Sequence, residues 1–194
     1  DDLIQRLDER MQETDSIIRS IKDYVRPNEL RLSKEDINSI LSKIAQDIEP
    51  TIGKSISLKL NLDKDLPELM LDSERISRAI EEIIQNASHF IRDGGEIFLR
   101  TGMASSDERK RFSLSENQQL IAIEIIDSGI GIMDVDKEKI FYPFYSTRAA
   151  GTGQGLAIVA TDIKLHGGFI REIGKYGEGA DFLILLPIYK KGGS

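Results

Sequence analysis

The sequence of 194 residues predicts an α+β fold: a two-layer sandwich with helices stacked on one face of a mixed sheet, preceded by a separate helix. Three observations predict it. Strand-like segments interleave with segments whose apolar residues recur at helical spacing. Some strands follow one another as hairpins, which favours a mixed sheet over a doubly wound parallel one. Hydrophobic residues make up 40% of the chain, enough for a core that no disulfide supports, because cysteine is absent.

The first segment, residues 1–27, has the pattern of a coiled-coil or bundle helix. Its seam positions alternate in steps of three and four: Ile4, Leu7, Met11, Thr14, Ile18, Ile21 and Val25. Pro27 ends the helix. Such a helix would leave an apolar face in water, so we expect it to pack on another helix of the same kind, in this chain or a second one. The pattern is already under way at Asp1, which indicates that an upstream part is missing.

A linker and a second helix follow. The stretch 28–34 reads as the linker, and Ser33 followed by Asp36 resembles a capping box. The helix that it opens carries one apolar face, made of Ile37, Ile40, Leu41, Ile44 and Ile48. Strict alternation over residues 56–60 then predicts a half-buried strand.

A long helix comes next, from Ser73 to about Arg92, with Asp72 and Ser73 as its cap. A short apolar piece, 69–71, precedes it, and Gly94-Gly95 turns the chain after it. The remaining predicted elements are strands at 96–101 and 120–127, a short helix near 137–141, a helix at 155–166, and strands at 169–173 and 181–187. The polar segment 105–118 is predicted to be a long hairpin loop.

Composition excludes several classes of function. A net charge of −7 and a pI of about 5.0 argue against a nucleic-acid partner, because phosphate backbones are bound mainly by clustered Lys and Arg. No apolar run is long enough for a membrane span, and the first residues lack the basic region and apolar core of a signal peptide, so we expect a cytoplasmic protein without membrane contact. With no Cys and two His, a thiolate or multi-histidine metal centre is not expected.

The long helix carries the first group of candidate residues. At 100° per residue its isoleucines gather on one side, while Glu82, Asn86 and His89 form a stripe on roughly the opposite side. Taken alone, this stripe is typical of a solvated polar face.

The second candidate is Asp127, at the end of a nearly all-apolar strand. A carboxylate there needs a donor, and the exocyclic amino group of adenine is one, whereas guanine presents a carbonyl. Gly129 and Gly131 allow backbone to approach a flat base closely. The alternative is a plain turn after a strand, since Asp-Ser-Gly is ordinary turn chemistry.

The third candidate is the glycine cluster from Gly151 to Gly155, immediately before a predicted helix. Exposed amides at a helix start, next to glycines, can bind phosphate, although a glycine linker has the same composition. Arg148, in a short segment that resembles a lid, could place a guanidinium on a terminal phosphate. The cluster does not fit a dinucleotide fingerprint, and Gly53-Lys54-Ser55 lacks the first glycine of a P-loop.

The order of these motifs resembles the N, G1, F, G2 and G3 boxes of the catalytic domain of sensor histidine kinases. They are Asn86, Asp127-Ser-Gly129-Ile-Gly131, Phe141-Tyr-Pro-Phe144, Gly151-Thr-Gly153-Gln-Gly155-Leu and Gly177-Glu-Gly179. The resemblance covers about residues 37–187, and the short lid at 146–150 looks most like the nitrogen-regulator sensor kinases. It implies the Bergerat-type ATP-binding sandwich shared with gyrase, a heat-shock chaperone and mismatch-repair ATPases.

The resemblance also implies roles for single residues. Asn86 would coordinate Mg²⁺, and Glu82 would hold a metal-bound or attacking water. His89 would contact phosphate with a pH-dependent contribution, and Arg148 would reach the γ-phosphate of ATP. The other implied nucleotide contacts are Asp127, Gly129 and Gly131 at the base, Gly151, Gly153 and Gly155 at the phosphates, and Tyr145, Thr152, Gln154 and Leu156 beside them.

The implied activity is transfer of the γ-phosphoryl group of ATP to a histidine on a dimerisation helix, and then to an aspartate of a response regulator. The helix 1–27 is similar to the second helix of that homodimeric domain, and residues 28–194 would be the catalytic domain. Three departures stand out: Ser128 replaces Asn, Gln154 replaces Leu, and Ala180 replaces Thr. Two alternatives remain: a stand-alone ATPase of the superfamily, or a non-catalytic module for nucleotide sensing or dimerisation.

Overall fold

A mixed five-stranded sheet is the base of the fold in this computed structural model, which describes residues 29–53, 55–148 and 151–189. In sheet order the strands are β2 (Ile56–Asn61), β4 (Gly95–Met103), β5 (Leu120–Asp127), β7 (Asp181–Pro187) and β6 (Phe169–Glu172). β2 runs parallel to β4, and every other neighbouring pair is antiparallel. The predicted mixed sheet is therefore confirmed.

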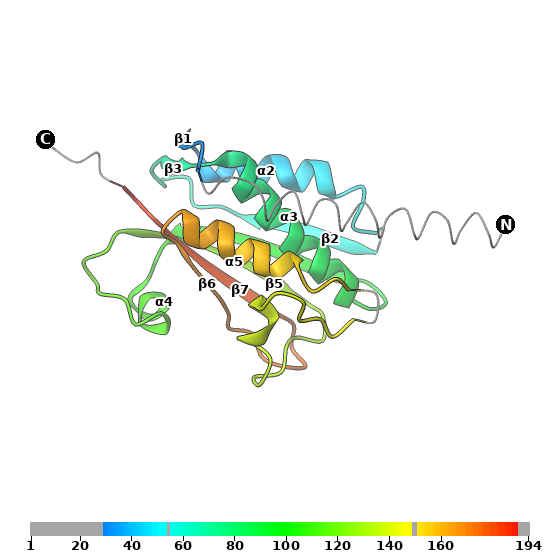
Figure 1. Ribbon diagram of the computed structural model, residues 1–194. Coiled ribbons are helices and arrows are strands. Elements are labelled where there is room, and N and C mark those ends of the chain that lie inside the picture. The colour runs from blue at the N-terminus through cyan, green and yellow to red at the C-terminus, as the bar shows by residue number, and fades with distance from the viewer. Residues whose placement is uncertain (1–28, 54, 149–150, 190–194) are drawn as a thin grey trace, which may run out of the picture.

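Three helices cover one face of this sheet: α2 (Ile37–Ile48), α3 (Ser73–Phe90) and α5 (Gly155–Leu165) (Figure 1). Alternation along the central strand explains the two layers. Ile121, Ile123 and Ile125 of β5 belong to the main core under the helices, while Leu120 and Ala122 point to a smaller cluster on the other face. Burial of these two apolar sets stabilises the packing of other segments on both faces of the sheet.

The central helix α3 follows its prediction and ends two residues earlier. Its buried face contains Ile76, Ile80, Ile83, Ile84 and Ala87. The carboxylate of Asp72 caps it by accepting from the backbone N–H of Arg75. The polar side of α3 is thereby directed away from the sheet, toward the loops that precede α5.

The predicted capping box at Ser33 is wrong. Ser33 lies in a short strand, β1 (Ser33–Glu35), which pairs with β3 (Leu69–Leu71). Asp36 caps α2 instead, accepting from the N–H of Asn38 at 2.9 Å. Pairing with β3 holds residue 33 in extended backbone, so the helix can begin only after it.

The segment 105–118 is not a simple loop. It contains α4 (Ser106–Arg111), which opens with a capping box between Ser105 and Glu108. Phe112 and Leu114 after this helix pack on the smaller cluster, so α4 lies on the sheet face opposite the long helices. The helix predicted near 137–141 is a single 3₁₀ turn, η1 (Lys139–Phe141).

A buried polar network joins α3 and α5 at the end remote from the glycine cluster. His166, which follows α5, accepts from the N–H of Asp72 at 3.0 Å through Nε2, so its Nδ1 carries the proton donated to the Asp162 carbonyl. Asp162 also pairs with Arg75 at 2.7 Å and with Arg78 at 3.1 Å. These contacts fix the two helices against each other.

The predicted N-terminal helix, residues 1–27, and the dimer that it implies lie outside the described residues. Within the described ranges, no helix combines the length and the hydropathy that crossing a bilayer requires.

Candidate functional site

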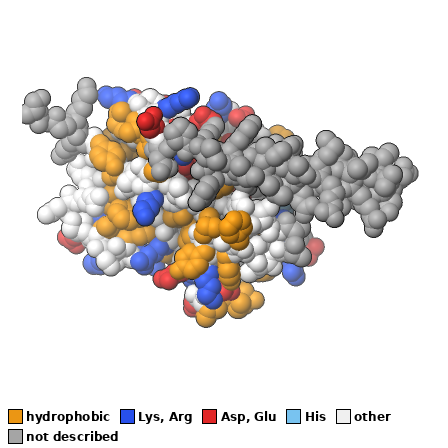
Figure 2. All heavy atoms as spheres, viewed as in Figure 1, with side chains coloured by type: hydrophobic (Ala, Val, Ile, Leu, Met, Phe, Trp, Pro, Cys, Tyr) orange, Lys and Arg blue, Asp and Glu red, His pale blue; other side chains and the backbone are white. Residues whose placement is uncertain are grey.

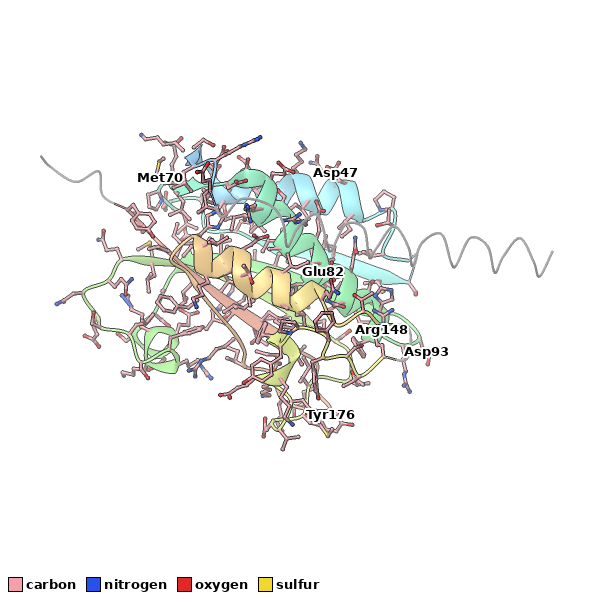
Figure 3. The ribbon with its side chains drawn as sticks, in the orientation of Figure 1. Asp47, Met70, Glu82, Asp93, Arg148 and Tyr176 are labelled. Atoms are coloured by element: carbon pink, nitrogen blue, oxygen red, sulfur yellow. The ribbon has the colours of Figure 1, made fainter. Side chains whose placement is uncertain are left out.

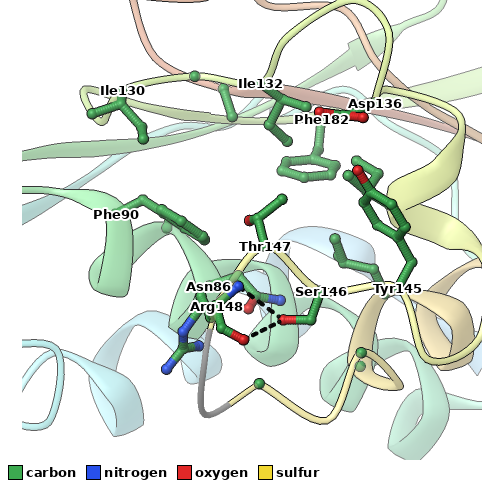
Figure 4. Close-up of a pocket in the computed structure, with 18 of the residues that line it drawn as sticks. Asn86, Phe90, Ile130, Ile132, Asp136, Tyr145, Ser146, Thr147, Arg148 and Phe182 are labelled. Atoms are coloured by element: carbon green, nitrogen blue, oxygen red, sulfur yellow. Dashed lines mark hydrogen bonds between the residues drawn. The ribbon is translucent and has the colours of Figure 1, made fainter.

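A cavity of about 300 Å³ lies between the polar side of α3, the start of α5 and the loops around residues 130–136 and 145–153. It brings together eleven of the residues predicted from sequence. They are Glu82, Asn86, Asp127, Gly131, Tyr145, Arg148, Gly151, Thr152, Gly153, Gly155 and Leu156. Figure 4 shows Asn86 and Arg148 on one side of the cavity and Ile130 and Ile132 across from them.

Three predicted residues do not line the cavity: His89, Gly129 and Gln154. His89 is exposed beside Arg148, and partial desolvation of its ring, together with the Arg148 charge, lowers its pKa. The N–H of Gly129 donates to Asp127, and Gln154 is the residue before α5. Their proposed nucleotide contacts stay predictions.

One wall of the cavity is apolar, and its residues were not predicted from the sequence. Ala87 and Phe90 of α3 and Phe182 of β7 lie with loop residues on this wall, and Asp136, Ser146, Thr147 and Tyr176 add polar groups. The other apolar members are Ile130, Ile132, Met133, Ile140 and Ala180. Ile130 and Ile132 alternate with glycines, a period-two signal that could have indicated a shared face. Phe90 and Phe182 carried no such signal.

Asp127 is 5% exposed and occupies the floor of the cavity. Its Oδ1 accepts two backbone hydrogen bonds, from Gly129 at 2.7 Å and from Ala180 at 3.2 Å. Burial raises the pKa of Asp127; the two N–H groups act against that rise, and the charge of Glu172 adds to it. Both backbone bonds use the same oxygen, which leaves the other for a ligand.

Glu82 and Asn86 lie one helical turn apart on α3 and line the cavity together with Arg148. Figure 3 shows Arg148 near Glu82. Burial raises the pKa of Glu82, against the opposing effects of the Arg148 charge, a hydrogen bond with Asn86 and the Arg78 charge. Arg148 is held by Ser146, whose hydroxyl accepts from the Arg148 N–H and donates to its carbonyl, both at 3.1 Å. Ala149 and Ala150, the end of the predicted lid, lie outside the described residues.

The glycine cluster places a free helix start in the cavity. α5 begins at Gly155, and Gln154 before it makes no side-chain cap hydrogen bond. The first N–H groups of a helix have no partner within the helix and attract negative charge; here the carboxylate of Glu82 lies against Gly155. Gly153 has φ +66°, and a Cβ there would lie 2.5 Å from the carbonyl carbon of Phe144. A larger residue could not make this turn.

Two side chains that flank the cavity are joined to each other. The Tyr145 hydroxyl donates to Asp136, and this hydrogen bond lowers the pKa of Asp136 and raises that of Tyr145. The two residues connect the loop that follows Gly131 to the segment that leads into the lid, and Figure 4 shows both at the same side of the cavity.

Exposed hydrophobic side chains occur on the loops that build the cavity, and two of them, Met133 and Tyr176, line it. Met133, Val135, Tyr142, Phe144 and Tyr176 are between 48% and 77% exposed. Figure 2 shows hydrophobic side chains at several places on this face, some of them beside charged side chains in its lower part. Phe144 combines this exposure with a φ of +67°, stabilised by its N–H donating to the Gly153 carbonyl at 2.8 Å.

Ser128, one of the departures from the family pattern, is directed away from the cavity. Its hydroxyl accepts from the N–H of Glu96 at 2.9 Å, at the start of β4. It thus supports the strand pairing beside the Gly94-Gly95 turn, whereas Ala180, another of the departures, lines the cavity.

The described residues contain no group of three or more His, Cys, Asp or Glu side chains suited to a metal ion. The oxygen atoms of Asn86 and Glu82 lie in the same cavity as the free helix start. Mg²⁺ prefers oxygen ligands and is often held by one or two side chains together with substrate phosphates. The donor set therefore fits magnesium only in company with a phosphate ligand.

The family model described as "Histidine kinase-, DNA gyrase B-, and HSP90-like ATPase" matches residues 71–190. Among curated proteins, the sensor histidine kinase ZraS of Escherichia coli O157:H7 is 29% identical over 173 residues, which are 89% of this chain and 35% of ZraS. The sensory histidine kinase/phosphatase NtrB of Vibrio alginolyticus is 32% identical over 162 residues, 81% of this chain and 45% of NtrB. This chain thus spans less than half the length of these relatives.

Two solved structures share the fold. Full-length ShkA in complex with AMPPNP has a TM-score of 0.75 at 22% identity, covering 96% of this chain and 37% of ShkA. Histidine kinase ThkA in complex with the response regulator protein TrrA has a TM-score of 0.74 at 22% identity, covering 96% of this chain and 51% of ThkA. Both likenesses support the predicted sandwich.

Proposed function

The chain belongs to the family of histidine kinase-, DNA gyrase B- and HSP90-like ATPases, and from this premise we propose that it binds Mg·ATP and donates the γ-phosphoryl group to a histidine. One observation carries the proposal. Asp127, Asn86 and the glycine cluster, far apart in sequence, line a single cavity. Its apolar wall suits a flat base, and its free helix start suits phosphates.

Adenine would be recognised by Asp127. Its Oδ1 is occupied by two backbone N–H groups, so Oδ2 would accept from the exocyclic amino group of the base. A guanine would present a carbonyl to the same carboxylate and leave two acceptors facing each other. Phe90, Ile130 and Phe182 would cover the faces of the base.

The phosphates would lie against the N-terminus of α5, where unpaired N–H groups and the helix dipole favour negative charge. Arg148 would contact the terminal phosphate. Asn86 and Glu82 would hold Mg²⁺, which when bound neutralises phosphate charge. Catalysis of phosphoryl transfer consists mainly of placement and charge neutralisation, so these groups suffice once an acceptor histidine is in line.

We propose that the acceptor belongs to a dimerisation domain whose second helix is formed by residues 1–27, in a homodimer. His89 and His166 are not suitable acceptors, because one lies on α3 and the other is 2% exposed. The onward acceptor would be an aspartate in the receiver domain of a response regulator, the type of partner found with ThkA. Because such a kinase draws on cytoplasmic ATP, we also propose a cytoplasmic location.

The decisive experiment supplies a peptide or domain containing the upstream helix, with its histidine, to this chain and Mg·ATP. Acid-labile phosphate on that helix is the expected result. An Asn86→Ala variant of the chain should transfer none. A chain that binds Mg·ATP tightly but never phosphorylates the helix would contradict the kinase assignment.

A second candidate function is ATP hydrolysis, favoured by Glu82. Burial raises its pKa, which suits a residue that accepts a proton from water. Phosphate release by the chain alone separates the two activities. A non-catalytic nucleotide-sensing module would bind Mg·ADP in calorimetry yet show neither phosphate release nor transfer.

A further inference from the structure

Two loops build the outer wall of the cavity beside Asp127. Residues 130–136 form one, and residues 174–180 between β6 and β7 form the other. The N–H of Gly177 donates to the carbonyl of Ile130 at 2.8 Å. A Cβ on Gly131 would lie 2.7 Å from the carbonyl oxygen of Gly179, so the backbones touch. The shape of this wall therefore depends on how the two loops are held together.

An ion pair between a half-buried lysine and a buried glutamate joins the same loops behind the wall. Nζ of Lys137 lies 3.3 Å from Oε2 of Glu172, and their side chains are 19% and 0% exposed. Lys137 also donates to the carbonyl of Gly174 and pairs with Asp134 at 3.0 Å. Burial lowers the pKa of Lys137, but its bond to Asp134 and the charge of Glu172 outweigh this and raise it, so the amine stays charged.

Glu172 connects this ion pair to the floor of the cavity. Its Oε1 accepts from the N–H of Gly174 at 2.9 Å and from the N–H of Asp181 at 3.1 Å, at the two ends of the loop. The residue before Asp181 is Ala180, whose N–H donates to Asp127. One carboxylate thus holds both ends of a loop that positions the carboxylate of Asp127.

Stability alone does not account for such a pair. Burying two charges costs desolvation energy that their attraction roughly repays, so apolar residues of similar size would hold the fold as well. The pair formed by Lys175 and Glu178 on the same loop is 76% and 64% exposed, as is usual for surface charges. An ion pair with several further hydrogen bonds fixes geometry, and here it fixes the position of one loop relative to the other.

We propose that Lys137 and Glu172 are positioning residues for the nucleotide base: their ion pair sets the separation of the two loops and the orientation of Asp127. This inference rests on the proposed function, since it assumes that the base lies against this wall. Neither residue lines the cavity, so both act through their neighbours.

The test compares Lys137→Met with Lys175→Met, a control that removes an exposed lysine from the 174–180 loop. Calorimetry with Mg·ADP should show affinity about tenfold weaker for Lys137→Met, the usual size for losing a supporting contact behind a binding group, and no change for Lys175→Met. Lys137→Arg should restore most of the affinity. Equal affinities for Lys137→Met and Lys175→Met would overturn the proposal.

If Lys137→Met leaves Glu172 unpaired and the chain fails to fold, the double variant Lys137→Met with Glu172→Met removes both charges. We expect it to fold and to bind Mg·ADP weakly. Wild-type affinity in that variant would also overturn the proposal.

The Glu172→Gln variant tests the pH dependence of Mg·ADP binding, which a purely structural role of Glu172 would leave unchanged. The charge of Glu172 raises the pKa of Asp127, so its removal should shift the loss of Mg·ADP binding on the acid side to lower pH. A uniform loss of affinity at every pH would count against positioning of Asp127.

Hydrogen exchange without nucleotide separates this inference from the proposed function. The amides of Gly177 and Ala180 should exchange faster in Lys137→Met than in the wild type or Lys175→Met. If they do so in a chain that never binds Mg·ADP, the loop coupling holds and the nucleotide assignment fails. Unchanged exchange at both amides would refute the coupling itself.

Discussion

The carboxylate of Glu82 lies directly against Gly155, the first residue of α5, so that a side-chain carbon at position 155 would overlap it. A negative charge at a helix N-terminus is favoured by the helix dipole. Glu82 therefore occupies the same positive region that the phosphates of a nucleotide would use. The contact explains why glycine stands at the start of α5, and it suggests that a cation must accompany the phosphates.

Gly155→Ala should displace Glu82 from the start of α5 and weaken Mg·ADP binding. Overpacking of a fitted site costs about 1–3 kcal/mol, which corresponds to roughly 5- to 150-fold in affinity. Titration calorimetry measures it. Gly102→Ala is the matched control, because a Cβ there meets nothing within 4 Å. Binding unchanged in Gly155→Ala would mean that Glu82 can move aside freely.

Glu82→Gln tests which reaction the site performs. If the chain is a kinase without its acceptor, its phosphate release from Mg·ATP should stay near background, and the substitution should leave it there. A coupled phosphate assay measures this. Turnover well above background that disappears in Glu82→Gln would favour the ATPase, because the carboxylate would then be needed to accept a proton from water.

Asp127→Ala should abolish Mg·ADP binding while the fold persists. The substitution removes the adenine acceptor and also leaves the N–H groups of Gly129 and Ala180 without their partner, at about 1–3 kcal/mol each. Asp127→Asn keeps an acceptor for both and exchanges only the second oxygen for a donor. Circular dichroism checks the fold, and normal adenine affinity in Asp127→Asn would contradict the proposed base contact.

Arg148→Ala should weaken ATP binding more than ADP binding, because a guanidinium at the cavity mouth would gain most from the additional phosphate charge. Calorimetry with a non-hydrolysable ATP analogue and with ADP gives the two affinities. Arg171→Ala, an exposed arginine on β6 that lies over Phe112, is the control. If the affinities for both nucleotides fell equally, Arg148 would not contact the γ-phosphate.

Asp181→Asn should stabilise the protein at neutral pH. Burial, with the charges of Glu124 and Glu172, raises the pKa of Asp181 to about 6. The folded state therefore binds this proton more tightly than the unfolded state, and stability falls as pH rises from about 4 through 6. The ionised group costs up to about 3 kcal/mol at pH 7. Urea denaturation at pH 5 and pH 7 should show a smaller pH difference in Asp181→Asn than in the wild type.

The control for this experiment is Asp107→Asn, because the Asp107 side chain is 88% exposed on α4. Its pH dependence should match the wild type. A wild-type protein that is equally stable at both pH values would contradict the expected cost of ionised Asp181.

The sequence by itself determined the local elements and the residues able to do chemistry. Helical periodicity located α3 with its buried isoleucines, and alternation located β2, because side-chain spacing reports which face of an element is covered. Glycines marked turns that favour glycine, as at Gly153, where φ is +66° and a Cβ would clash with the backbone of Phe144. The prediction failed at Ser33, where pairing with a distant strand overrode a local capping signal.

Only the tertiary structure decided which of these residues meet. Phe90 and Phe182 line one cavity because the order of strands in the sheet brings their elements together. Lys137 pairs with Glu172 because two loops pack closely. Glu82 met Gly155 because α3 and α5 lie side by side on the same face. Periodicity describes one element at a time, whereas contacts between remote segments depend on how all the elements pack together.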